Sequence, residues 1–136
     1  DKDLTNVVLA EEQNVKYHMQ HLDSSKALAS IFAMFDKANK YIEQTEPYIL
    51  AKDPEKKQRL DTVLRNLLET IRIGTIHLSA FLPEVSKKVL EHFNVEPKIT
   101  QPELYALEEG KVLETLPILF PRLDIAKELE ELSKLC

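Results

Sequence analysis

The chain has 136 residues, of which 43% are hydrophobic and 30% are charged, so the composition predicts one globular domain. Two glycines against seven prolines argue against an all-β fold, which needs many tight turns, and no Gly-rich phosphate loop occurs. The net charge of -5 argues against a generic nucleic-acid coat and against a protein that binds anionic membranes.

The single cysteine, Cys136, allows no internal disulfide and no Cys-based zinc site, which fits a reducing, intracellular compartment. No apolar run approaches the roughly 18 residues of a membrane span, and no signal-peptide pattern is present. Because the sequence starts with Asp1 rather than Met, we expect it to be part of a longer, cytoplasmic chain.

Apolar residues recur at helical spacing through the first two thirds of the chain. The first predicted helix covers 4–22, with one apolar stripe made of Leu4, Val8, Val15, Met19 and Leu22. Asp23 offers a side-chain cap for a second helix at 25–44, which must end before Pro47. Its expected apolar face consists of Leu28, Ile31, Phe32, Phe35, Ala38 and Ile42.

Asp53 and Pro54 form a helix-start signal for a third helix at 54–79. Its apolar positions are Leu60, Leu64, Leu67, Leu68, Ile71, Thr75 and Leu78. Gly74 lies inside this helix at a cost of ~1 kcal/mol, which suggests the close approach of another backbone. Pro83 opens a fourth helix at 83–93.

The pattern changes after Asn94, where four prolines interrupt a stretch with little periodicity. We expect 94–123 to be irregular, with the apolar segment 116–121 extended along the bundle, and a last helix at 124–135. The whole chain, 1–136, is thus predicted to be one all-α helical-bundle domain. Residues 24–93 hold 11 basic and 9 acidic side chains, so the central helices are mildly basic while the two ends are acidic.

No group of residues suggests a catalytic site. His18 and His21 are spaced to share a metal ion, but no third ligand is evident, so exposed structural histidines are favoured. Along the third helix Asp61, Arg65, Glu69 and Arg72 are spaced for local ion pairs. We therefore expect no enzyme activity, no metal and no cofactor in this chain itself.

The link between the second and third helices carries the most informative pattern. Tyr48 directly follows Pro47, and an aromatic ring at the end of a bundle can stack on a single-stranded base. Four basic residues that could contact phosphates follow closely: Lys52, Lys56, Lys57 and Arg59. Pattern alone favours a simpler interpretation, in which Tyr48 covers the core and the lysines form a solvated helix start.

Residues 38–53 read Ala-Asn-Lys-Tyr-Ile-Glu-Gln-Thr-Glu-Pro-Tyr-Ile-Leu-Ala-Lys-Asp, which resembles the anticodon-binding domain of methionyl-tRNA synthetase. That family has a similar Asn-Arg/Lys-Tyr-Ile run, then Glu-x-x-Pro-Trp, then Ala-Lys. Residues 64–69, 78–84 and 119–124 are similar to later pieces of the same family in the same order, so the resemblance runs over about 25–124.

The resemblance implies a helical bundle of the class I aminoacyl-tRNA synthetase type that reads the CAU anticodon of methionine tRNA. Tyr48 stands where the family has a tryptophan that stacks on an anticodon base, so weaker stacking is expected. Lys52 matches a nearby family lysine, and Pro47 would fix the approach of the aromatic ring.

The expected partners are methionine tRNA and the catalytic domain of a parent methionine-tRNA ligase, with no DNA and no membrane. ATP would be used in that catalytic domain, which this sequence lacks. The family's preceding helix, whose Asn and Arg contact anticodon bases, has no counterpart before Asp1, so we expect only part of the site. The alternatives are a protein-docking bundle without an RNA role and the related domain of another class I synthetase.

Overall fold

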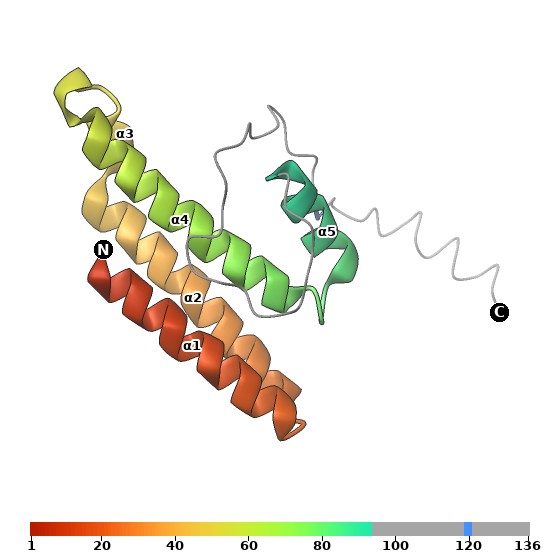
Figure 1. The fold of residues 1–136 in the computed structure, drawn as a ribbon. Coiled ribbons are helices and arrows are strands. Elements are labelled where there is room, and N and C mark those ends of the chain that lie inside the picture. The colour runs from red at the N-terminus through yellow and green to blue at the C-terminus, as the bar shows by residue number, and fades with distance from the viewer. Residues whose placement is uncertain (94–118, 121–136) are drawn as a thin grey trace, which may run out of the picture.

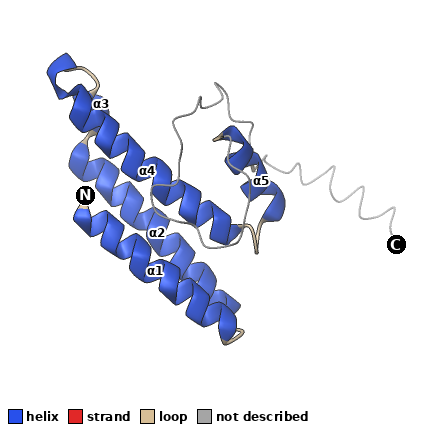
Figure 2. Cartoon of the chain, viewed as in Figure 1, coloured by secondary structure: helices blue, strands red, loops and turns tan. Residues whose placement is uncertain are grey.

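A computed structural model describes residues 1–93 and 119–120, and all regular structure within these residues is helical (Figures 1 and 2). The elements are α1 (Lys2–Gln20), α2 (Ser24–Thr45), the single-turn α3 (Pro47–Leu50), the 3-10 turn η1 (Pro54–Lys56), α4 (Lys57–Leu78) and α5 (Pro83–His92). The predicted extended segment at 116–121 lies almost wholly outside the described residues, as does the predicted helix at 124–135. The single-domain extent of 1–136 stays a prediction.

The helix boundaries follow the local signals. The Asp23 carboxylate accepts a hydrogen bond from the Lys26 backbone N–H at 3.2 Å, so the predicted cap of α2 is confirmed. Helix α2 ends at Thr45, and Glu46 then adopts a left-handed conformation with φ 44°. The signal at Asp53 and Pro54 starts η1, which leads into α4 three residues later than expected.

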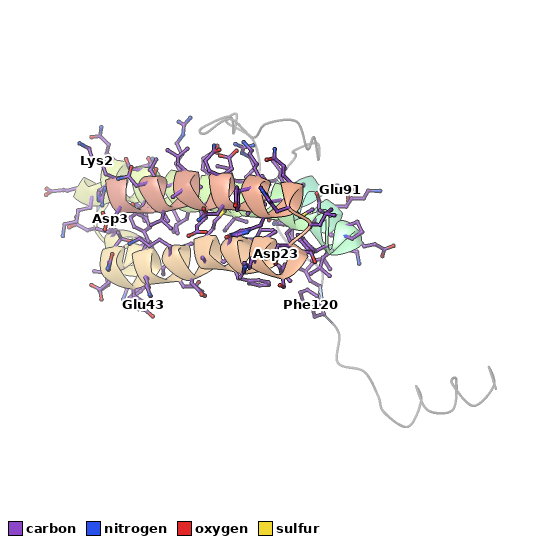
Figure 3. The ribbon with its side chains drawn as sticks, turned by 90° about the horizontal axis from the view of Figure 1, so that it is seen from below. Lys2, Asp3, Asp23, Glu43, Glu91 and Phe120 are labelled. Atoms are coloured by element: carbon purple, nitrogen blue, oxygen red, sulfur yellow. The ribbon has the colours of Figure 1, made fainter. Side chains whose placement is uncertain are left out.

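The three long helices α1, α2 and α4 lie side by side, and α5 packs beside the carboxyl end of α4 (Figure 1). Figure 3 shows Lys2 and Asp3 at the same end of this bundle as Glu43, with Asp23 at the opposite end. The core between the helices is a continuous apolar cluster: Leu4, Val8, Val15, Ile31, Met34, Ala38, Tyr41, Val63, Leu67, Ile73 and Leu78.

The buried faces differ in part from the predicted stripes. On α1, Leu4, Val8 and Val15 are buried as expected, but Met19 is exposed and Leu22 is 92% exposed beyond the helix end. Glu12 is buried on the same face, where its carboxylate pairs with Lys16 at 2.7 Å. The apolar stripe therefore stops before the end of α1.

On α2 the buried face is rotated from the predicted one. Phe32 and Ile42, expected in the core, are exposed, whereas Met34 and Tyr41 are buried. On α4 the predicted Leu64 is also exposed. Since α2 packs against both α1 and α4, the two neighbours together select the face that is buried.

One expectation for α4 needs correction. The neighbour of Gly74 is a side chain rather than a backbone, because a Cβ atom there would lie 2.7 Å from two ring carbons of Phe35. The spacing of Glu69 and Arg72 predicts a local ion pair, which is confirmed, and this pair is buried. Both Nε and Nη2 of Arg72 donate to one carboxylate oxygen of Glu69, at 3.1 and 2.9 Å.

Candidate nucleic-acid interface

The segment between α2 and α4 forms the tip of the bundle at the end that carries the chain start (Figure 1). The left-handed Glu46 redirects the chain after α2, and Pro47 occupies the first turn of α3, where its missing N–H is not needed. Leu50, at the end of α3, packs against the core. The tip is thus a short helix that Leu50 anchors to the core. Sequence analysis expected only a connecting link here.

Tyr48 projects from α3 and is 59% exposed, so it does not cover the core. Its hydroxyl donates to the carboxylate of Glu46 at 3.2 Å. The negative charge of Glu46 raises the pKa of the Tyr48 hydroxyl, with smaller contributions from burial and from this hydrogen bond. The phenol therefore stays neutral, with its aromatic ring available for stacking.

The basic residues of the tip differ in whether they form ion pairs. The structure describes no ion pair for Lys52 or Lys57 with residues 1–93, and both are exposed. The Lys56 ammonium lies 3.3 Å from the carboxylate of Asp53, in a surface pair that solvent screens. Arg59 is held instead by Asp1, whose carboxylate accepts from Nη1 at 2.5 Å and from Nη2 at 3.0 Å.

Sequence analysis missed the polar cluster behind this arginine. The hydroxyl of Tyr41, a core residue of α2, also donates to the Asp1 carboxylate, and it accepts from the Asn66 side chain at 3.3 Å. Asp1 and Arg59 are 58 residues apart in sequence, so no local spacing could have indicated their contact.

The histidines considered as metal ligands have other neighbours. The ring of His21 lies 4.2 Å from that of Tyr17, and its Nδ1 is 2.8 Å from the Tyr17 carbonyl oxygen. Within residues 1–93 and 119–120, no group of three or more His, Cys, Asp or Glu residues is arranged to hold a metal ion. No helix in the same part of the chain is long and apolar enough to cross a membrane.

A family model described as the anticodon-binding domain of methionyl tRNA ligase matches residues 1–134. The methionine–tRNA ligase of Caldanaerobacter subterraneus is 42% identical over 137 residues, which covers 98% of this chain and 22% of that protein. The ligase of Clostridium tetani is 40% identical over 139 residues, which covers 99% of this chain and 21% of that protein.

Among solved structures, the apo form of Mycobacterium tuberculosis methionyl-tRNA synthetase superposes with a TM-score of 0.70 at 24% identity. The match covers 90% of this chain and 26% of the mycobacterial chain, and it supports the all-α fold. The sequence and fold therefore define a helical tRNA-recognition domain.

The chain belongs to the family of anticodon-binding domains of methionyl-tRNA ligases. It spans about a fifth of the length of the curated relatives it matches.

Proposed function

We propose that this chain binds the anticodon loop of methionine tRNA and so helps a methionine–tRNA ligase select that tRNA. The observation that carries the proposal is the exposed ring of Tyr48 on a short, anchored helix, with exposed lysines following within ten residues of the chain. ATP-dependent aminoacylation would take place in another part of the parent enzyme. Use of ATP and the cytoplasmic location both stay predictions.

The residues at the tip have distinct proposed roles. Tyr48 stacks on an anticodon base, a contact worth ~1–3 kcal/mol for an aromatic ring. Pro47 orients the turn from which the ring projects, and Lys52 contacts the anticodon loop beside it. Lys56 and Lys57 contact backbone phosphates, where the weak pair of Lys56 with Asp53 can open.

The charge distribution is compatible with this proposal. The net charge of the whole chain is -5, but residues 24–93 carry an excess of two positive charges. A domain that stacks on a few unpaired bases needs fewer cations than one that coats a long backbone. The acidic ends of the chain therefore do not exclude an RNA ligand.

The experiment compares binding of methionine tRNA with that of the same tRNA carrying an altered anticodon, at several salt concentrations. We expect the unaltered tRNA to bind more tightly at every salt concentration, because base contacts persist while phosphate contacts weaken. Equal affinities throughout would leave only electrostatic attraction and would reject anticodon recognition by this chain.

A second candidate function is docking onto another protein surface, which the exposed apolar side chains away from the tip favour. Leu22 is 92% exposed and Phe32 is exposed on α2. In the parent enzyme these side chains would contact the catalytic part of the same chain. The variants Leu22→Ser and Phe32→Ser should then bind tRNA normally, whereas a loss of tRNA affinity would count against a separate docking surface.

A further inference from the structure

From the contacts of Arg59 we infer that Asp1, Tyr41 and Arg59 form an interhelical clamp that positions the Tyr48 tip, rather than a site for RNA phosphate. The inference rests on the proposed function, because its purpose is to hold the surface that binds RNA. It assigns Arg59 a different role from the phosphate contact that sequence analysis predicts.

The clamp joins three helices through one carboxylate. Asp1 precedes α1, Tyr41 lies in α2 and Arg59 lies in the first turns of α4. Both terminal nitrogens of Arg59 donate to Asp1, at 2.5 and 3.0 Å, and the Tyr41 hydroxyl donates to the same carboxylate. This forked geometry is specific to a guanidinium and cannot be reproduced by an ammonium group.

The inner part of the clamp is fixed by burial. Tyr41 is only 4% exposed, and its hydroxyl also accepts from Asn66 of α4, which is buried. A phosphate that took Arg59 would deprive the Asp1 carboxylate of both guanidinium hydrogen bonds. It would also leave that negative charge, still held by the Tyr41 hydroxyl, beside the RNA backbone. Both consequences oppose a phosphate contact by Arg59.

Two residues of the clamp, Tyr41 and Arg59, flank the segment that carries Tyr48. Tyr41 lies one turn before the end of α2, where its carbonyl accepts from Thr45 at 2.6 Å, and Arg59 lies just after η1. The segment between these two anchors contains α3, Tyr48 and the lysines. Because the clamp ties both ends of the segment to α1, it limits the positions that the Tyr48 ring can take relative to the lysines.

The test measures methionine tRNA affinity and its salt dependence for the full chain and for Asp1→Asn, Arg59→Gln and the double variant. We expect each single variant to bind about three- to tenfold more weakly, with the double variant no weaker than the singles, since all three break one clamp. The slope of the logarithm of affinity against the logarithm of salt concentration, here called the salt slope, should stay unchanged. In Lys57→Gln, by contrast, it should fall by about 0.7, because one phosphate contact is lost.

A phosphate contact by Arg59 would predict a change of tRNA affinity in the opposite direction. If Arg59 contacts phosphate, Asp1→Asn frees the guanidinium and tightens binding, while Arg59→Lys keeps most of the affinity. A clamp predicts weaker binding in both variants. Tighter binding by Asp1→Asn, or a lower salt slope in Arg59→Gln, overturns the inference.

A fluorescent base analogue at the stacked anticodon position separates positioning from general stability. At saturating protein, its quenching should be smaller with Asp1→Asn and with Tyr41→Phe than with the unaltered chain, and unchanged with Arg65→Gln. Arg65 is the matched control, an exposed arginine on the same helix. If Tyr48→Ala leaves the quenching unchanged in the otherwise unaltered chain, the proposed stacking fails, whatever the clamp variants show.

Discussion

The ring of Phe35 on α2 occupies the space that Gly74 on α4 leaves open. A Cβ atom at position 74 would lie 2.7 Å from both Cε1 and Cζ of that ring, closer than side-chain contacts normally allow. The absence of a side chain at Gly74 therefore sets how closely α2 and α4 approach, and these two helices carry the tip with Tyr48 between them.

Replacing Gly74 tests this contact. In an isolated helix, Gly→Ala is stabilising by up to ~1 kcal/mol. Here the ring must move, and we expect Gly74→Ala to destabilise the fold by ~1–3 kcal/mol in chemical denaturation. The double variant with Phe35→Leu should recover part of the loss, since it removes the clashing atoms. An increase in the free energy of unfolding of Gly74→Ala would show that the ring adapts freely.

Tyr48 should be important for RNA binding and unimportant for folding. Because the side chain is 59% exposed, Tyr48→Ala should shift the thermal midpoint little. We expect its tRNA affinity to fall by roughly tenfold, from a stacking contact of ~1–3 kcal/mol. Tyr48→Phe should retain most affinity, because it keeps the ring, and Tyr48→Trp should bind more tightly, because the larger ring stacks over more area. Unfolding of Tyr48→Ala at a much lower temperature would instead indicate a role in the core.

The buried pair of Glu69 and Arg72 should dominate the stability of α4. Glu69→Ala deprives a buried guanidinium of the Glu69 carboxylate, 2.9 Å away, and loss of one partner of a buried pair costs about 3–5 kcal/mol. Denaturant unfolding should show this loss. The matched control is Asp61→Ala, which removes an exposed carboxylate from the same helix and should change stability by less than ~0.5 kcal/mol. Equal effects of the two substitutions would contradict the importance of the buried pair.

His77 should make the stability depend on pH. Burial lowers the pKa of this imidazole from its usual 6.5, against the raising effect of Glu12 and with a smaller lowering effect of Lys16. Its Nε2 atom is buried and has no hydrogen-bond partner within residues 1–93 and 119–120. The full stabilisation is thus present above pH 6.5, where the ring is neutral in both states.

As the pH falls below 6.5, the unfolded chain binds a proton that the folded chain resists, so the free energy of unfolding falls. His77→Gln should show a shallower decrease than the unaltered chain between about pH 6.5 and pH 5 in thermal unfolding. His92→Gln serves as the control for loss of a histidine. Identical pH profiles for His77→Gln and the unaltered chain would show that His77 does not contribute.

Local chemistry made several features predictable. The carboxylate of Asp23 caps α2 as expected, and Pro47 does mark the end of that helix, because both effects depend only on neighbouring backbone groups. The resemblance of residues 38–53 led to the family that the comparisons show. The proposed RNA contacts, Tyr48 among them, stay predictions.

Other features could not be predicted because they depend on how several helices pack together. Phe32 and Met34 are both apolar residues of α2, yet only Met34 is buried, since the face toward α1 and α4 depends on how all three helices pack. The polar surroundings of Arg59 are a further example, because spacing along α4 says nothing about Asp1.

Sequence alone determined that this chain is helical, where most of its first helices begin and end, and which family its motifs resemble, because these follow from periodicity and local order. Only the tertiary structure decided that Tyr48 is exposed on a short anchored helix and that Arg59 is paired with Asp1 while Lys52 and Lys57 face solvent. The physical reason is that exposure and pairing depend on groups brought together from different helices, which no spacing within one helix encodes.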